Sequence, residues 1–145
     1  MKRRSTYLIV LISGILISLI SCKKTIDKAQ YEEYVYLNHT SHLLTIKVYN
    51  RKNDGFLEQT YNIALNQLLK QEIELMAGSI TGIIPLSDSV IVIFGNERIS
   101  RFTHFSSSPF NIMNLNNYVR EKKGSNRNSY TYTFTQEDFI NAVEP

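Results

Sequence analysis

The feature that most constrains the fold is an alternation of apolar and polar side chains with a period of two residues. In the segment 42–50 (HLLTIKVYN), Leu44, Ile46 and Val48 fall on alternate positions, and the segment 130–135 (YTYTFT) repeats the pattern with aromatic rings. Successive side chains of a β-strand point to opposite faces, so this spacing predicts strands with one buried face. We therefore expect a mainly β protein.

The same criteria predict five more strands, at 34–37, 58–65, 71–76, 89–94 and 98–105. The segment 89–94 (SVIVIF) lacks alternation, which predicts a central strand that is covered on both faces. Turn residues separate the strands. We expect a hairpin turn at 38–42, a turn at 53–55 and a two-residue hairpin turn at Gly95 and Asn96.

Two short helices are expected among the strands. The segment 109–119 spaces its apolar residues as one helical stripe, and Thr135 is a suitable N-cap for a terminal helix. The segment 120–128 (REKKGSNRN) is predicted to be a loop. Together these elements predict an antiparallel β-sandwich of the immunoglobulin-like sort over residues 31–145, with a barrel as the alternative.

The first 21 residues differ in composition from the remainder. Three cationic residues at 2–4 precede an apolar run at 7–20 (YLIVLISGILISLI), which is followed by Ser21 and Cys22. This is the plan of a secretory signal peptide, and the run is shorter than the about 20 residues that a membrane-spanning helix needs. We expect a signal helix over 1–21 that is removed on maturation, with a retained membrane span as the alternative.

The residues Leu19-Ile20-Ser21-Cys22 resemble a bacterial lipobox. The resemblance implies cleavage between Ser21 and Cys22, a thioether from the Cys22 sulfur to diacylglycerol and, in many species, acylation of the new amine with a chain such as palmitate. Each buried methylene contributes about 0.8 kcal/mol, so two or three chains attach a protein durably. Residues 22–30 would then be the lipidated cysteine and its tether, and the mature chain would have no thiol for a disulfide.

The net charge of +3 comes from the leader. Removing residues 1–21 lowers Lys plus Arg from 16 to 13, which equals the 13 Asp plus Glu. A neutral body offers no concentrated positive surface for phosphates, so we expect no nucleic-acid partner. The expected partners are the membrane, through the N-terminal lipid, and an envelope protein or glycan.

The segment 111–142 is similar to the ending of small lipoproteins of Bacteroides-type bacteria. The similarity lies in an Asn- and Ile-rich turn, a tyrosine, a variable loop, a YTYT-like strand and an acidic and aromatic close near Ala142. It implies a β-rich domain in the cell envelope, which we assign to the outer membrane, and it transfers no catalytic residue. Some surface lipoproteins of that lineage carry acidic residues after the cysteine, whereas this chain has Lys23 and Lys24. The sequence therefore does not predict which leaflet of the outer membrane holds the anchor.

Sequence patterns for catalysis are absent. There is no Gly-x-Ser-x-Gly elbow, Walker loop or GxGxxG motif. His39, His42 and His104 are too few and too dispersed to predict a metal centre, and Glu72 and Glu74 are interpreted as solvent-facing residues of one strand. We expect no enzymatic activity, no cofactor and no metal.

The sequence also predicts a modification site and a ligand-binding strip. Asp88-Ser89-Val90 resembles the O-glycosylation acceptor motif of Bacteroides-type bacteria, with Ser89 as the acceptor or, alternatively, as a residue at a strand edge. Four tyrosines would form an aromatic strip if their strands are neighbours, and such a strip binds sugars or peptides; core packing is the alternative reading. The four are Tyr34, Tyr36, Tyr130 and Tyr132.

The expected function follows from the anchor and the fold class. We expect a lipid-anchored, non-enzymatic binding or structural accessory module whose ligand is unknown. A carbohydrate or peptide binder that uses the tyrosine strip is the alternative, and a hydrolase is a third possibility.

Overall fold

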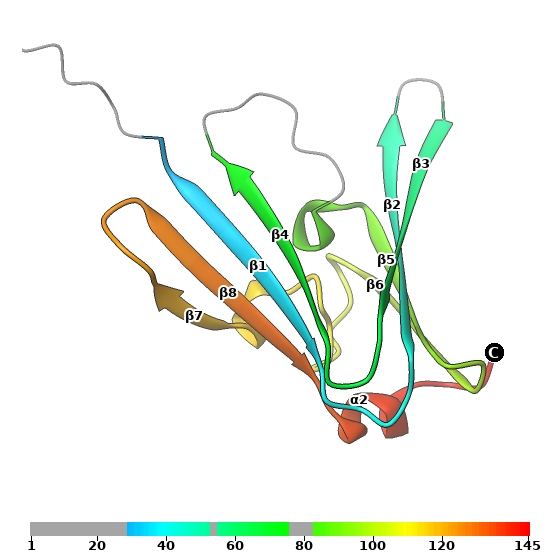
Figure 1. Cartoon of the computed structure of the whole chain (residues 1–145). Coiled ribbons are helices and arrows are strands. Elements are labelled where there is room, and N and C mark those ends of the chain that lie inside the picture. The colour runs from blue at the N-terminus through cyan, green and yellow to red at the C-terminus, as the bar shows by residue number, and fades with distance from the viewer. Residues whose placement is uncertain (1–28, 53–54, 76–82) are drawn as a thin grey trace, which may run out of the picture.

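A computed structural model describes residues 29–52, 55–75 and 83–145, and it consists of two four-stranded sheets that face each other (Figure 1). The mainly β, two-sheet expectation is confirmed. The predicted signal helix lies outside the described residues. The strands are β1 (Tyr31–Asn38), β2 (Leu44–Lys52), β3 (Gly55–Ile63), β4 (Leu68–Glu74), β5 (Ser89–Phe94), β6 (Arg98–Thr103), β7 (Val119–Lys122) and β8 (Arg127–Phe134), and the helices are the 3-10 turns η1 (Ile84–Leu86) and η2 (Leu115–Asn117) and the α-helix α2 (Gln136–Asn141).

Sheet A has the strand order β4-β1-β8-β7, and sheet B has the order β3-β2-β5-β6. All pairs in sheet B are antiparallel, but in sheet A β1 runs parallel to β8, with Tyr31 opposite Arg127. The prediction of a fully antiparallel sandwich is therefore wrong for sheet A. Local patterns specify pairing between consecutive strands, whereas β1 and β8 lie at opposite ends of the domain sequence.

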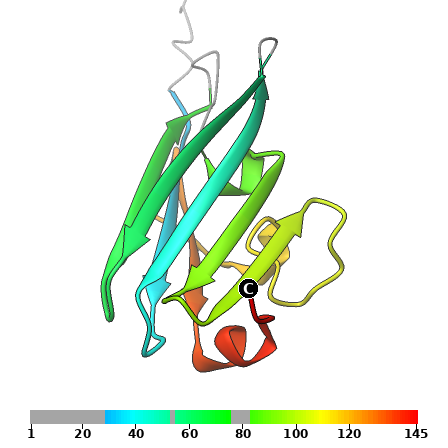
Figure 2. The same ribbon diagram turned by 90° about the vertical axis from the view of Figure 1, so that its right-hand side faces the viewer.

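The core lies between the two sheets. Leu44, Ile46 and Val48 of β2 are completely buried, as the alternation predicts. β5 is a central strand between β2 and β6. However, its residues Ile91 and Ile93 are partly exposed, because no described segment covers the outer face of sheet B (Figure 2). The prediction that β5 is covered on both faces is therefore wrong.

Two of the predicted turns differ in the structure. The segment 38–42 does not close a hairpin but carries the chain from β1 in sheet A to β2 in sheet B. The β5–β6 hairpin has three loop residues rather than two, since Phe94 pairs with Arg98. Gly95 has a φ of 58°, which suits a residue without a Cβ. In the turn predicted at 53–55, residues 53 and 54 lie outside the described residues.

The predicted helix at 109–119 is wrong, and a strand was missed beside it. Only the 3-10 turn η2 forms there. The rest of this irregular segment runs from β6 in sheet B to β7 in sheet A and closes the open side of the sandwich with the buried side chains of Ile112 and Met113 (Figure 1). The strand β7 overlaps the predicted loop at 120–128, and its four residues are all exposed, so they show no apolar alternation.

The terminal helix α2 forms where it was predicted. Thr135 is its N-cap residue, and Asp138 Oδ2 accepts hydrogen bonds from the backbone N–H and the hydroxyl of Thr135, each at 2.8 Å. After α2 the chain crosses to sheet B, where Val143 forms a bridge with Ile99 of β6.

Candidate functional site

The four tyrosines of the predicted strip are neighbours. β1 and β8 pair with Tyr34 opposite Tyr130 and Tyr36 opposite Tyr132. The rings lie on the inner face of sheet A, where Tyr34, Tyr36 and Tyr132 are 1%, 0% and 4% exposed. Tyr130 is partly exposed and stacks on Tyr34, with ring centroids 5.3 Å apart. Core packing therefore describes three of the rings, and the surface available to a ligand is limited to Tyr130.

The hydroxyl groups of these tyrosines are held inside the domain. The Tyr132 hydroxyl lies 2.6 Å from Asp138 Oδ1 and 2.9 Å from the carbonyl oxygen of Phe110. Burial raises the pKa of Tyr132 strongly, and the Asp138 carboxylate raises it further. Tyr34 donates to Glu32 Oε2 at 2.7 Å, and burial together with this carboxylate raises its pKa. Both hydroxyls stay protonated and serve as structural donors.

The histidines do not converge. His39 and His104 are exposed, whereas the ring of His42 stacks on Phe139 at 4.0 Å between centroids and lies 3.6 Å from a carboxylate oxygen of Glu97. Within the described ranges, no group of three or more metal-ligating side chains occurs. The exposed Glu72 forms an ion pair with Arg127 at 3.0 Å.

Of the predicted modification sites, Ser89 lies in the part of the chain that the structure describes, whereas Ser21 and Cys22 do not. Ser89 opens β5 and is partly exposed on the outer face of sheet B, opposite to the face of Val90. The preceding Asp88 accepts a hydrogen bond from the backbone N–H of Arg51. Glycosylation of Ser89 stays a prediction. Ser21 and Cys22 lie outside the described residues, so cleavage and lipidation stay predictions too.

The end of the predicted tether is bonded to the domain. The side chain of Asn126 donates to the carbonyl oxygen of Ala29 at 2.8 Å, and the N–H of Leu75 donates to that of Gln30 at 2.8 Å. Asn126 lies in the turn between β7 and β8. The chain thus enters the domain beside the turn of the β7–β8 hairpin (residues 119–134). We call this turn, residues 123–126, the hairpin tip, and the end of the domain where it lies the tether end.

Basic side chains surround a shallow hollow of about 210 Å³ at the tip of this hairpin. Lys123 pairs with Glu121 at 2.6 Å, so its charge is balanced. The guanidinium of Arg120 lies 5.7 Å from the ring centroid of Tyr130 and donates to Asn128. Arg120 and Lys122 have no carboxylate partner in the part of the chain that the structure describes. The tether end therefore presents unpaired positive charge.

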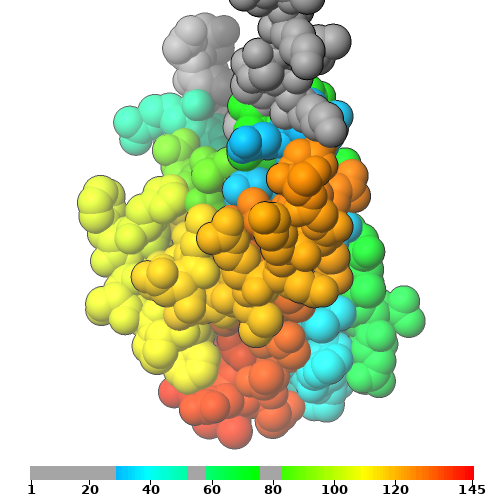
Figure 3. All heavy atoms as spheres, turned by 90° about the vertical axis from the view of Figure 1, so that its left-hand side faces the viewer, coloured from blue at the N-terminus to red at the C-terminus, as the bar shows by residue number. Residues whose placement is uncertain are grey.

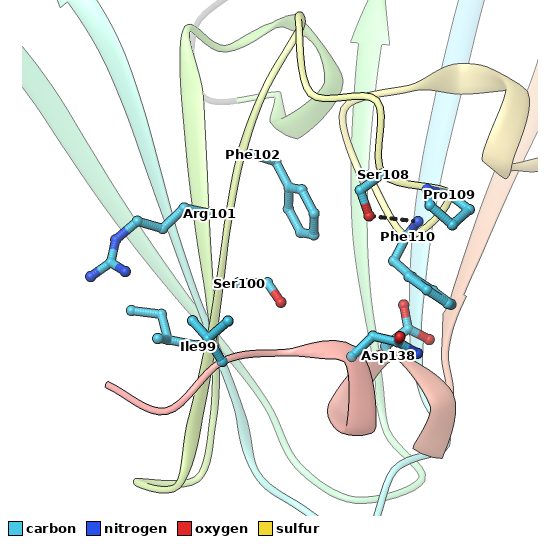
Figure 4. A pocket seen from close by; sticks show the side chains of 10 residues that line it. Ile99, Ser100, Arg101, Phe102, Ser108, Pro109, Phe110 and Asp138 are labelled. Carbon is cyan, nitrogen blue, oxygen red and sulfur yellow. Dashed lines mark hydrogen bonds between the residues drawn. The ribbon is translucent and has the colours of Figure 1, made fainter.

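A larger pocket, of about 480 Å³, lies between β6, the segment after it, and α2 (Figure 4). Ser100 and Phe102 form one wall and Phe110 another, and the side chain of Arg101 points away from the space. Asp138 also lines it but is only 6% exposed, and both of its oxygens accept hydrogen bonds from Tyr132 or Thr135. Its carboxylate therefore positions α2.

The two hollows lie toward opposite ends of the domain. β1 begins at the tether end, and β8 runs beside it for eight residues before α2 follows. At about 3.3 Å per residue this separates α2 from the tether end by about 25 Å. Figure 3 shows the β7–β8 hairpin in the upper part of one face and α2 at its lower end.

Sequence reasoning missed the larger pocket. Its walls come from β6, the irregular segment and α2, which meet only because the segment 104–118 closes the sandwich. The run Ser106 to Pro109 (SSSP) marks irregular structure but gives no signal of a cavity.

The class of protein that these features define is a two-sheet, mainly β domain with one short α-helix and a pocket at the edge of sheet B. In comparisons with known proteins, no family model matches the chain, and no curated protein or solved structure is significantly similar to it. Of the helices in the described residues, none has the length and apolar character to span a bilayer.

Proposed function

We propose that this protein is a lipid-anchored lipoprotein of the bacterial envelope, attached to the outer membrane, and that it acts as a non-enzymatic binding module. The observation that carries the proposal is the separation of the tether end from the larger pocket. Ala29 follows Cys22 by seven residues, which span at most about 25 Å when extended. A lipid on Cys22 would hold the hairpin tip within this distance of the bilayer, with the larger pocket toward the opposite end of the domain.

The charges at the tether end support this orientation. Arg120 and Lys122 line the hollow at the hairpin tip, and the tether contributes Lys23, Lys24 and Lys28. A basic side chain close to an anionic membrane contributes about 1 kcal/mol of attraction. The proposed orientation therefore brings unpaired cations to the headgroups.

Palmitate labelling tests the anchor. Cells that are grown with radiolabelled palmitate should label the parent protein, whereas the Cys22→Ala variant should carry no label, because the acceptor sulfur and the cleavage site are lost. Ser21→Ala is the matched control and should keep the label, since the residue before the cysteine stays small. Equal label on Cys22→Ala, or intact protein in the cytosol, would contradict the anchor.

Fluorescence quenching tests the orientation. The chain contains no tryptophan, so one introduced indole reports a single place. In vesicles of phosphatidylglycerol brominated near the headgroup, the lipidated Ser125→Trp variant at the hairpin tip should be quenched. The Ile140→Trp variant, at an exposed position of α2, should not. Equal quenching of the two variants would refute the orientation and leave the palmitate result standing.

A second candidate function is carbohydrate binding at Tyr130. The partly exposed ring of Tyr130 beside the Arg120 guanidinium favours it, since sugars pack on aromatic faces. Tyr130→Ala should then abolish retention on a glycan array without loss of the β-sheet circular dichroism signal. Tyr132→Ala is unsuitable as a test, because the buried ring supports the core.

Two finer expectations, an immunoglobulin-like fold and a hydrolase function, stay proposals. The two facing sheets support an immunoglobulin-like relation, whereas the parallel β1–β8 pair weighs against it. A hydrolase function has weaker support, because Asp138 is the one carboxylate among the described residues of the larger pocket and its oxygens already accept hydrogen bonds.

A further inference from the structure

The edge of β6 has one gap in its hydrogen bonding. Ile99, Arg101 and Thr103 direct their backbone groups away from β5, since alternate residues of a strand bond to opposite sides. Val143 bonds both groups of Ile99, at 2.8 and 3.0 Å. Thr103 receives a hydrogen bond from Asn111 and donates one to Ser106. The N–H and C=O of Arg101 have no partner among the described residues.

This gap coincides with the wall of the larger pocket. Arg101 lines the pocket through its backbone, because its side chain points away toward the outer face of sheet B (Figure 4). On either side of it, Ser100 and Phe102 line the pocket, and Phe110 faces them from the irregular segment. An unpaired backbone donor and acceptor thus lie beside a space whose lining includes the rings of Phe102 and Phe110.

We propose that the pocket receives an extended three-residue peptide segment of a partner, which pairs with Arg101 as an added strand. Val143 already pairs with the edge of β6 in this way two residues before Arg101, where it exchanges two backbone hydrogen bonds with Ile99. Main-chain bonds to a sheet edge are a common mode of peptide recognition. The segment is short because the positions opposite Ile99 and Thr103 are already occupied.

The geometry also specifies the side chains of the peptide. A residue directly opposite Arg101 shares its outer face, whereas the two residues beside it point to the inner face. The guanidinium of Arg101 is exposed and forms no ion pair within the described ranges, so an acidic residue opposite it is favoured. The flanking residues enter the pocket near Phe102 and Phe110 and are apolar. The preferred segment is therefore apolar, acidic, apolar.

This inference rests on the proposed binding role of the pocket but not on the lipid anchor. The test uses the purified full chain in detergent, and the probe is the tripeptide acetyl-Leu-Asp-Leu-amide with a fluorescent tag, followed by anisotropy. We expect saturable binding that weakens about tenfold when the aspartate nitrogen is methylated, which corresponds to the loss of one hydrogen bond. A failed palmitate experiment would leave this measurement unaffected, so the two failures are distinguishable.

Reversal of the charge at Arg101 provides the second part of the test. The parent should prefer the aspartate peptide to the corresponding lysine peptide, and Arg101→Glu should reverse that preference. Arg101 is exposed, so the exchange should leave folding unchanged. Lys70→Glu, at an exposed position of β4 in sheet A, is the control that should keep the aspartate preference. The proposal is overturned if the tagged peptide does not saturate at millimolar protein, if methylation has no effect, or if Arg101→Glu still prefers aspartate.

Discussion

At the residue scale, Asn38 joins the two places where the chain crosses between the sheets. Its side-chain amide donates to the carbonyl oxygens of His42 at 2.8 Å and Ile63 at 2.9 Å, and its Oδ1 accepts from the N–H and the hydroxyl of Thr40. The residue is completely buried. A buried polar group that loses its hydrogen-bond partner is no longer compensated for its removal from water, and the stability of the fold falls by that desolvation free energy.

We predict that Asn38→Ala lowers the free energy of unfolding by about 3 kcal/mol, because buried donors and acceptors are left unpaired. Urea denaturation followed by circular dichroism measures the change. Asn96→Ala is the matched control: this asparagine is exposed in the β5–β6 turn, and its substitution should stay within about 0.5 kcal/mol. Equal effects of the two substitutions would show that the Asn38 amide is not a structural link.

The tyrosine strip could be predicted from the sequence only in part. The alternation in 130–135 correctly indicates that Tyr130, Tyr132 and Phe134 share a face. It does not indicate which face is buried, because tyrosine suits both a core and a sheet surface. That choice depends on sheet B and on the irregular segment with Ile112, both distant in sequence.

At the element scale, Asp138 holds α2 in place and thereby supports the edge of sheet B. It accepts hydrogen bonds from Tyr132 in β8 and from Thr135 at the start of α2. Val143 bonds to Ile99 only after the chain has passed through this helix. A loosened α2 therefore exposes the edge of β6.

We predict that Asp138→Ala lowers the free energy of unfolding by about 1–3 kcal/mol and speeds hydrogen exchange at the Ile99 amide, since the Tyr132 hydroxyl and the Thr135 N–H lose their acceptor. Glu137→Ala serves as the control in the same turn of α2, where the side chain is exposed, and it should change stability by no more than about 0.5 kcal/mol. Unchanged exchange at Ile99 in Asp138→Ala would disprove the coupling.

The strands that sequence patterns predicted and the one that they missed differ in burial. β2, β5 and β8 each bury one face, and the resulting apolar alternation or run is visible in the sequence. β7 is held by its hydrogen bonds to β8, and its side chains are exposed, so no pattern of burial distinguishes it from a loop. The larger pocket escaped prediction for a related reason, because its walls belong to three separate elements.

At the scale of the whole molecule, the core contains four buried tyrosines. Burial raises the pKa of Tyr34, Tyr36, Tyr118 and Tyr132 above the ordinary value of 10.0. In the unfolded chain these phenols ionise near that value, whereas the folded protein keeps them protonated. Their contribution to stability is therefore complete below about pH 10 and is lost as the pH rises further.

We predict that the free energy of unfolding is nearly constant between about pH 8 and about pH 9 and falls progressively faster through pH 10, approaching about 1.4 kcal/mol per pH unit for each of these buried tyrosines. Urea denaturation at several pH values measures the slope, and ultraviolet absorbance of tyrosinate should rise together with the loss of structure. A stability that stays level up to about pH 11 would contradict this account.

The parallel pairing of β1 with β8 also has a consequence in time. Glu33 and Ser129, which are hydrogen-bonded across this pair, stand 96 residues apart along the chain. When the chain emerges N-terminus first, β1 therefore cannot pair with β8 until almost all of the chain has emerged. On the export route that we propose, sheet A would therefore stay incomplete until nearly the whole chain has crossed the membrane.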